Sequence, residues 1–149
     1  MTMDELCDRH HRIGLNANAL IYLFESGGVL AGVTGALVDA AESGRVTIIV
    51  SALVLAEIAT GPISAGDEAL AERYADEVRS VRGLHIVPLT ADLALDAAIV
   101  RGRYRASVPD AIHLATARQA GATAFVTNDR AMPAVPGVRI LQLSDYLGR

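Results

Sequence analysis

The stretch RIGLNANALIYLFE, residues 12–25, begins like a buried strand and continues like a helix. Its first four residues form a short, mostly apolar run, and the apolar residues after them recur at helical spacing. Asn16 and Asn18 lie at the junction, where the chain has no charged side chain. A strand that leads directly into a helix is typical of α/β proteins, which often place a functional group at that junction. The stretch therefore predicts an α/β fold and raises the question of what two amides do there.

The same alternation of short apolar runs and longer helical stretches continues along the chain. Strands are expected at residues 12–15, 45–50, 84–89, 123–128 and 138–143. Helices are expected at about residues 18–25, 27–43, 52–60, 66–81, 90–104 and 109–121. No linker, repeat or change of composition divides the chain. This order predicts one domain over residues 1–149, with a mostly parallel central sheet and helices on both faces.

The composition indicates an aliphatic core and excludes several classes of protein. Hydrophobic residues make up 52% of the chain and aromatic residues only 4%, which favours buried strands under helices over disorder. The single cysteine, Cys7, excludes an internal disulfide and fits a reducing cytoplasm. The first residues, MTMDELCDRHHR, lack the apolar segment of a signal peptide, and no apolar run is long enough to span a membrane. We therefore expect a cytoplasmic protein without a membrane partner.

The charged residues exclude further kinds of site. The net charge of −4 argues against nucleic-acid binding over the whole surface. All 13 basic residues are arginine, and a chain without lysine cannot carry a P-loop or a phosphorylation receiver site. Three of these arginines, Arg101, Arg103 and Arg105, are expected to form a solvated helix end that could contact phosphates.

Polar side chains follow several of the predicted strands. Asn16 and Asn18 come after the first strand and Glu57 after the second, while Asp110 precedes the last long helix and Asp129 follows the fourth strand. The carboxyl ends of parallel strands meet at one edge of a sheet, so the topology could bring these side chains together. Three carboxylates and an amide would form a site of hard oxygen ligands suited to Mg²⁺ or Mn²⁺.

Each of these residues also has a purely structural interpretation. Glu57 would be solvated on an exposed helix stripe, although its neighbours from 52 to 58 are otherwise apolar. Asp110 fits a capping box with Ser107, and Asp129 fits a turn or a helix cap. His113 lies three residues beyond Asp110 and could approach the same helix face, but a packed, hydrogen-bonded core histidine is the more common case.

The sequence resembles the PIN-domain ribonucleases, in particular the VapC-type toxins of bacterial toxin–antitoxin pairs. The resemblance covers nearly the whole chain and is carried by IGLNANALIYLFE, SALVLAEI, VPDAIHLATA and FVTNDR, in that order and at that spacing. It implies a three-layer α/β/α fold and a cluster of acidic residues that holds one or two divalent ions. It also implies endonucleolytic cleavage of RNA, a homodimer, and inhibition by a small antitoxin protein.

The family residues can be placed on this chain one by one. Three family acids are matched, by Glu57, Asp110 and Asp129. Asn18 matches an asparagine that starts the first helix, and Thr127 matches a small hydroxyl residue near the last acid. Asn16 is the departure, because the family has aspartate there in a D-x-N pattern and this chain reads N-x-N. The resemblance thus implies Mg²⁺ or Mn²⁺ ligands or water-orienting groups at Asn16, Glu57, Asp110 and Asp129.

A hard dication gains much less from an amide than from a carboxylate, so Asn16 predicts weak metal binding and weak or absent cleavage. The substitution was either made so that a toxic nuclease could be produced, or it belongs to a naturally impaired member of the family. The leading hypothesis is a metal-dependent endoribonuclease toxin, impaired at Asn16. The alternatives are a non-catalytic PIN-fold protein that acts by binding antitoxin or RNA, and a small α/β phosphatase or nucleotide-binding domain.

Overall fold

The computed structural model of the chain describes residues 2–24 and 29–146. Its sheet contains β1 (Arg12–Leu15), β2 (Thr47–Ser51), β3 (Leu84–Val87), β4 (Ala124–Thr127) and β5 (Arg139–Gln142). The strands lie in the order β3-β2-β1-β4-β5, and all neighbouring pairs are parallel. The predicted mostly parallel sheet is confirmed, and it is wholly parallel in the described residues. Helices connect β1 to β2, β2 to β3 and β3 to β4, whereas residues 128–138 cross from β4 to β5 without a helix.

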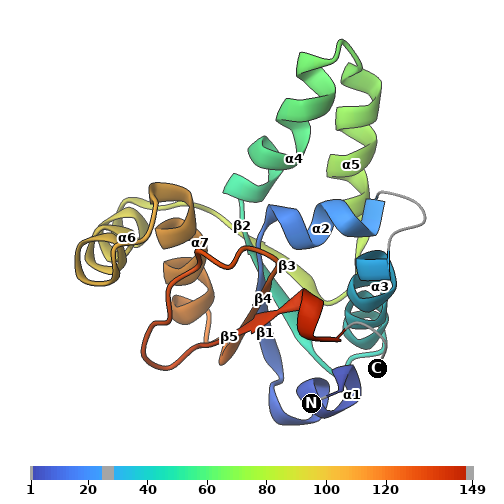
Figure 1. Cartoon of the computed structure of the whole chain (residues 1–149). Helices are drawn as coiled ribbons and strands as arrows, with labels where there is room; N and C mark the ends of the chain where they lie inside the picture. Colours follow the sequence, from blue (N-terminus) through green and yellow to red (C-terminus); the bar gives the residue numbers. More distant parts are fainter. Residues whose placement is uncertain (1, 25–28, 147–149) are drawn as a thin grey trace.

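Seven α-helices are described, and most of them connect strands. They are α1 (Met3–Arg9), α2 (Ala17–Phe24), α3 (Val29–Glu42), α4 (Leu53–Ser64), α5 (Glu68–Ser80), α6 (Ala91–Tyr104) and α7 (Val108–Gln119), with a short 3₁₀ helix at Leu143–Tyr146. In Figure 1, α6 and α7 lie on one side of the sheet, α1 and α3 lie on the other, and α4 and α5 project as a hairpin. The three-layer α/β/α architecture that the resemblance implies is confirmed.

Alternate strand residues supply two separate cores, one under each helical layer. Ile13 and Leu15 of β1 belong to the core shared with α1 to α5, whereas Phe125 of β4 belongs to the core under α6 and α7. Gly14 lets α7 approach β1 closely, since a Cβ atom there would lie 2.6 Å from Phe125 Cδ2 and 2.7 Å from Ala117 Cβ. This packing fixes α7 against the middle of the sheet, with its first turn near the carboxyl ends of the strands.

Two helices differ from the sequence prediction. Helix α1 was not expected, although Thr2 and Glu5 form a capping box at its start, which is a recognisable signal in the first five residues. Helix α4 was expected to end near residues 60–62, yet it continues through Gly61 and Pro62 to Ser64. Packing of α4 against α5 in the projecting hairpin outweighs the low helix propensity of these two residues.

Other boundaries agree to within a few residues or lie outside the described part. The ends expected for the first helix at Glu25 and for the second at residues 27 and 28 fall on residues that are not described. Gly121 follows α7 with a positive φ of 83°, as expected of a residue that ends a helix. Within residues 2–24 and 29–146, no helix combines the length and the apolar character needed to cross a bilayer.

Candidate functional site

The site is built around the ends of β1 and β4, which are neighbours in the sheet. Leu15 of β1 pairs with Val126 of β4. The residues that follow them, Asn16 and Thr127, therefore also lie side by side. Asn16 Nδ2 donates a hydrogen bond to Thr127 Oγ1 at 2.8 Å, and both side chains are buried. The same hydroxyl oxygen accepts the backbone N–H of Asp129 at 3.0 Å. Thr127 therefore links Asn16 to the predicted acid of the β4 turn.

The other half of the Asn16 amide is unsatisfied. Asn16 is 5% exposed, and its Oδ1 has no hydrogen-bond partner within the described part of the chain. A buried carbonyl oxygen without a partner costs about 1–3 kcal/mol, so such an atom is rare unless a ligand or a water completes it. Asn16, the departure from the pattern of the resembled family, thus carries a buried oxygen whose capacity to accept a hydrogen bond is unused.

Asn18 links the start of α2 to the turn after β4. Its Oδ1 accepts the backbone N–H of Asn128 at 3.1 Å, and Asn128 in turn donates from Nδ2 to the hydroxyl of Tyr22 at 3.0 Å. These two bonds tie the first turns of α2 to the end of β4. The turn that carries Asp129 is thereby fixed relative to Asn16.

Asp129 has the local hydrogen bond that its structural interpretation predicts. Its Oδ1 accepts the backbone N–H of Ala131 at 2.9 Å, which is the local bond of a turn-forming aspartate. Its backbone carbonyl also accepts from Gln142 Nε2 at 3.2 Å. Its negative charge nevertheless acts on Asp110, as the pKa of that residue shows.

Asp110 lies in the first turn of α7, where its backbone N–H is capped by Ser107 Oγ at 3.2 Å. The Ser107 half of the predicted capping box is therefore present. The pKa of the Asp110 carboxyl is raised, first by burial and next by the negative charge of Asp129, with a smaller contribution from Glu57. A hydrogen bond between the Asp110 side chain and Ser107, together with the nearby His113, acts to lower the pKa without cancelling these effects. Asp110, Asp129 and Glu57 thus lie within electrostatic reach of one another.

This raised pKa predicts how the stability of the metal-free chain depends on pH. The folded chain binds the Asp110 proton more tightly than the unfolded chain does, so ionisation of this carboxyl destabilises the fold as pH rises above its ordinary value of 3.8. We expect Asp110→Asn to unfold at a higher urea concentration than the parent at neutral pH in EDTA. The difference should narrow as the pH is lowered toward about 4. If the two chains differed in their urea midpoints by the same amount at neutral pH and at about pH 4, this prediction would be contradicted.

Glu57 lies on α4 and is held by a residue of α7. His113 donates from Nε2 to Glu57 Oε1 at 2.5 Å, since an ionised carboxylate can only accept. His113 is 2% exposed, and its Nδ1 has no partner among the described residues. The sequence predicted a buried core histidine, which is confirmed, but it did not predict the bond to Glu57. The three-residue spacing places His113 beside Asp110 on α7, but it does not indicate a partner on α4.

The types of side chain at this site suit a divalent cation, but their present positions do not form a metal-binding group. The oxygen donors suit Mg²⁺ or Mn²⁺, the Asn16 oxygen is unpartnered, and a cation would relieve the repulsion that acts on Asp110. However, no three Asp, Glu, His or Cys side chains of the described residues are placed to hold a metal ion together. Asn16, which is bonded to Thr127, supplies an amide and not a fourth acid. The assignment of metal ligands stays a prediction.

Comparison with known proteins agrees with this architecture. The family model of the PIN domain matches residues 13–138. A comparison with curated proteins finds no match.

Several solved structures have a similar fold. One is a toxin–antitoxin complex from Klebsiella pneumoniae, with 23% identity and a TM-score of 0.61 over 85% of this chain and 94% of that chain. Another is VapBC2 from Rickettsia felis bound to a promoter DNA fragment, with 19% identity and a TM-score of 0.67 over 88% and 98%. A third is Mycobacterium tuberculosis VapC20, described as a toxin that cleaves the sarcin–ricin loop, with 22% identity and a TM-score of 0.61 over 76% and 86%. At these identities the similarity establishes the fold.

Proposed function

The chain belongs to the PIN domain family, and from this premise we propose that it is a metal-dependent endoribonuclease, the toxin of a toxin–antitoxin pair, with activity impaired by Asn16. The observation that carries the proposal is the set of side chains at the ends of β1 and β4. There a buried amide with an unpartnered oxygen is linked through Thr127 to the backbone of Asp129, and the charge of Asp129 disfavours ionisation of Asp110. Such a set favours a positively charged ligand, and the phosphodiester chemistry of RNA is the reaction that a hard cation promotes.

The structural neighbours support the toxin–antitoxin part of the proposal. One of them is described as a toxin that cleaves the sarcin–ricin loop, and two are toxin–antitoxin assemblies. We accordingly propose a small antitoxin protein as the partner and RNA as the substrate. We also propose a homodimer as the assembly and the cytoplasm as the location, which the resemblance and the composition of the chain imply.

Each site residue has a role in the proposed hydrolysis. Asp110 and Glu57 would hold Mg²⁺ or Mn²⁺ directly or through water, with Asp129 as a further ligand or as the group that orients the attacking water. The bound cation would neutralise charge on the phosphoryl oxygens and acidify the attacking water. Asn16 would contribute only its neutral Oδ1, held in place by the bond from its Nδ2 to Thr127. The products would be a 5′-phosphate and a 3′-hydroxyl, without a covalent protein intermediate.

The ends of the RNA fragments test this reaction. The chain and an Asn16→Asp variant are incubated with total RNA in Mg²⁺ or Mn²⁺, and the fragment ends are sequenced by a method that requires a 5′-phosphate. We expect fragments with 5′-phosphates from the variant, few from the parent, and none in EDTA. Fragments with 5′-hydroxyl ends would contradict the mechanism, and hydrolysis of p-nitrophenyl phosphate without RNA cleavage would favour the phosphatase alternative.

One observation favours the non-catalytic alternative. In the described part of the chain the acids do not form a group that holds an ion, and Asn16 makes a good hydrogen bond without one. A protein that only binds antitoxin or RNA would not need acids that are grouped around a metal ion. In that case Asn16→Asp would change neither cleavage nor cell growth on expression, while antitoxin binding persisted.

His113 is expected to affect the metal site chiefly through its hydrogen bond to Glu57. Groups that hydrogen-bond a ligand orient it, and their loss typically costs about 10- to 100-fold in metal affinity. In an Asn16→Asp background, we expect His113→Leu to weaken Mn²⁺ binding by about that factor. His113→Gln, which keeps an N–H donor, should retain more affinity than His113→Leu.

Titration of Mn²⁺ by calorimetry, with circular dichroism to confirm folding, checks this expectation. Once Glu57 has been changed to alanine, His113→Leu should have no further effect on affinity. A folded His113→Leu variant that binds Mn²⁺ as tightly as its parent would show that the histidine is only a core residue.

A further inference from the structure

Arg105 has a backbone conformation that is otherwise found only at glycine in the described part of this chain. It ends helix α6 with a φ of 57° and a ψ of 36°, in the left-handed region. Five of the six described residues with a positive φ are glycine, and Arg105 is the sixth. A side chain in this region is crowded by its own backbone, so glycine or asparagine is the usual residue at such a helix end. The turn alone therefore does not explain an arginine at position 105.

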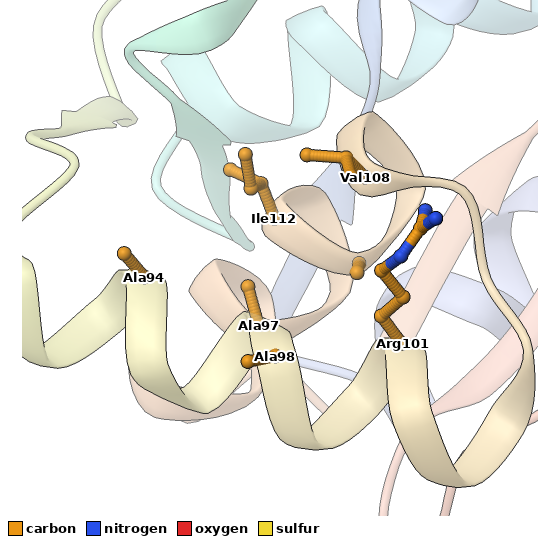
Figure 2. Close-up of a pocket in the computed structure, with 7 residues that line it drawn as sticks. Ala94, Ala97, Ala98, Arg101, Val108 and Ile112 are labelled. Carbon is orange, nitrogen blue, oxygen red and sulfur yellow. The ribbon is translucent and has the colours of Figure 1, made fainter.

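The side chain of Arg105 also makes no bond within the chain. It is exposed, and its guanidinium has no hydrogen-bond or ion-pair partner in the part of the chain that the structure describes. Arg101 differs, because its Nη1 donates to the carbonyl of Ala106 at 3.4 Å, and Figure 2 shows this side chain extending from α6 toward the start of α7. Arg103 lies in the last turn of α6, where a cation is favourable beside the carbonyl end of a helix. Arg105 is the arginine of this stretch that lies beyond the helix.

The backbone is held on both sides of Arg105. Its own N–H donates to the carbonyl of Arg101 at 3.0 Å, which closes the last turn of α6. Ala106 is buried, and Ser107 Oγ accepts the backbone N–H of Asp110 at 3.2 Å in the first turn of α7. The short connection between the two helices is thus fixed, and the side chain of Arg105 projects from a fixed point.

This connection keeps Arg105 near Asp110. Residues 105–107 span at most about 7 Å, and Ser107 precedes Asp110 by about one helical turn, so the Cα atoms of Arg105 and Asp110 are at most about 13 Å apart. An RNA strand that passes Asp110 covers this distance within a few nucleotides. A phosphate beside the one that is cleaved would therefore lie within reach of the Arg105 guanidinium.

The charge at the proposed site makes such a contact favourable. The site holds three acids in a chain of net charge −4, so phosphates that do not touch a bound cation gain from a nearby cationic side chain. Arg130 follows the site residue Asp129 directly, but its Nη2 donates to Ser144 Oγ at 2.8 Å and lies 3.7 Å from Asp145 Oδ1. Arg105 offers a guanidinium that is not bound in this way.

We propose that Arg105 binds a phosphate of the RNA next to the one that is cleaved, and so holds the strand across the proposed metal site. A phosphate is the ligand because a guanidinium presents several N–H donors in a plane that matches two phosphate oxygens. The left-handed backbone at this position is then a cost in stability that accompanies a binding role. This inference rests on the proposed function, which supplies RNA as the substrate.

RNA binding by the full chain tests the contact directly. A fluorescein-labelled single-stranded RNA of mixed sequence is titrated with protein in EDTA at several salt concentrations and followed by fluorescence anisotropy. We expect Arg105→Asn to weaken binding about tenfold at low salt. The slope of log K against log salt should become shallower by about 0.7, the value for one phosphate contact on a single strand. Arg105→Lys keeps the charge and should keep the slope of the parent.

Arg82→Asn is the matched control for loss of one positive charge. Arg82 is exposed and lies two residues before β3, at the amino edge of the sheet and away from the strand ends that carry the site. Arg82→Asn should change RNA affinity by less than about twofold, because charges farther apart than a Debye length are largely screened.

Urea unfolding separates binding from a role in the fold. Arg105→Asn and Arg105→Gly should unfold at the same urea concentration as the parent or at a higher one, because both residues adopt the left-handed region more readily than arginine. A residue that served only to shape the turn would not combine lower RNA affinity with unchanged or higher stability.

Cleavage kinetics distinguish this inference from the proposed function. In the Asn16→Asp background, Arg105→Asn should raise KM for RNA about tenfold and leave kcat within about twofold, because the contact is present both before and during the reaction. Cleavage with an unchanged KM would overturn the inference and leave the nuclease assignment intact. If Asn16→Asp does not cleave RNA but Arg105→Asn still weakens binding and lowers the salt slope, the catalytic assignment fails and the phosphate contact stands.

Four results of the binding and unfolding experiments would overturn the proposal. They are a parent chain that binds no RNA, an Arg105→Asn variant with the affinity and salt slope of the parent, an equal loss of affinity in Arg82→Asn, and a lower urea midpoint in both Arg105→Asn and Arg105→Gly.

Discussion

An Asn16→Asp variant is expected to bind Mn²⁺ at least about a hundredfold more tightly than the parent chain, because affinity for hard cations rises steeply with the number of charged ligands. Asn16 is almost fully buried, and its Oδ1 is unpartnered. A carboxylate in that place would act in surroundings where charge is weakly screened. Calorimetric titration of both chains with Mn²⁺, in the absence of RNA, measures the difference.

The surrounding structure can accept this change. Asn16 Nδ2 donates to Thr127 Oγ1, and a carboxylate has no hydrogen to donate. The Thr127 hydroxyl can rotate and donate to the carboxylate while its oxygen still accepts from the Asp129 backbone. Asn16→Ala serves as the control, because it removes the same amide without adding charge and should bind Mn²⁺ no better than the parent. Equal affinity of all three chains would show that position 16 is not a metal ligand.

Asp110→Asn in the Asn16→Asp background is expected to lower RNA cleavage by about a thousandfold, the scale of losing one principal stabiliser of transition-state charge. Asp110 is the acid whose pKa is raised by burial and by Asp129, so its charge is the one that a bound cation would offset most. The variant keeps the backbone cap from Ser107, because that bond uses the N–H of residue 110. The fold should therefore persist, and a loss of cleavage would report on the carboxylate.

Single-turnover cleavage of a defined RNA measures this effect. The matched control is Asp39→Asn, which removes an exposed acid from α3 on the other side of the sheet and should leave the rate unchanged. Cleavage by the Asp110→Asn double variant within tenfold of the Asn16→Asp rate would remove Asp110 from the proposed site.

Local sequence patterns were sufficient to predict the order of the strands and helices. Strand β1 was predicted at its observed residues, since a short apolar run followed by helical spacing depends only on neighbours in sequence. The same reasoning placed Asn16 and Asp129 at the ends of β1 and β4, because parallel strands share one carboxyl edge. It did not foresee helix α4 continuing past Pro62, which depends on packing against α5.

The contacts within the site depend on tertiary structure and were less predictable. The bond from His113 to Glu57 joins α7 to α4 across 56 residues of sequence, and no local pattern encodes it. The unpartnered Oδ1 of Asn16 likewise follows from the register of β1 and β4. The exposure of Leu95 and Ile99 could not be predicted either, because their spacing on α6 is that of a buried stripe.

The central claim is that Asn16 removes one charge from a metal-dependent nuclease site. Its most direct test compares RNA cleavage by the parent and by Asn16→Asp in Mg²⁺, in Mn²⁺ and in EDTA. The account predicts cleavage by the variant that requires either ion, at least about a hundred times faster than cleavage by the parent. No gain in metal-dependent cleavage by a folded Asn16→Asp variant that binds Mn²⁺ would contradict it.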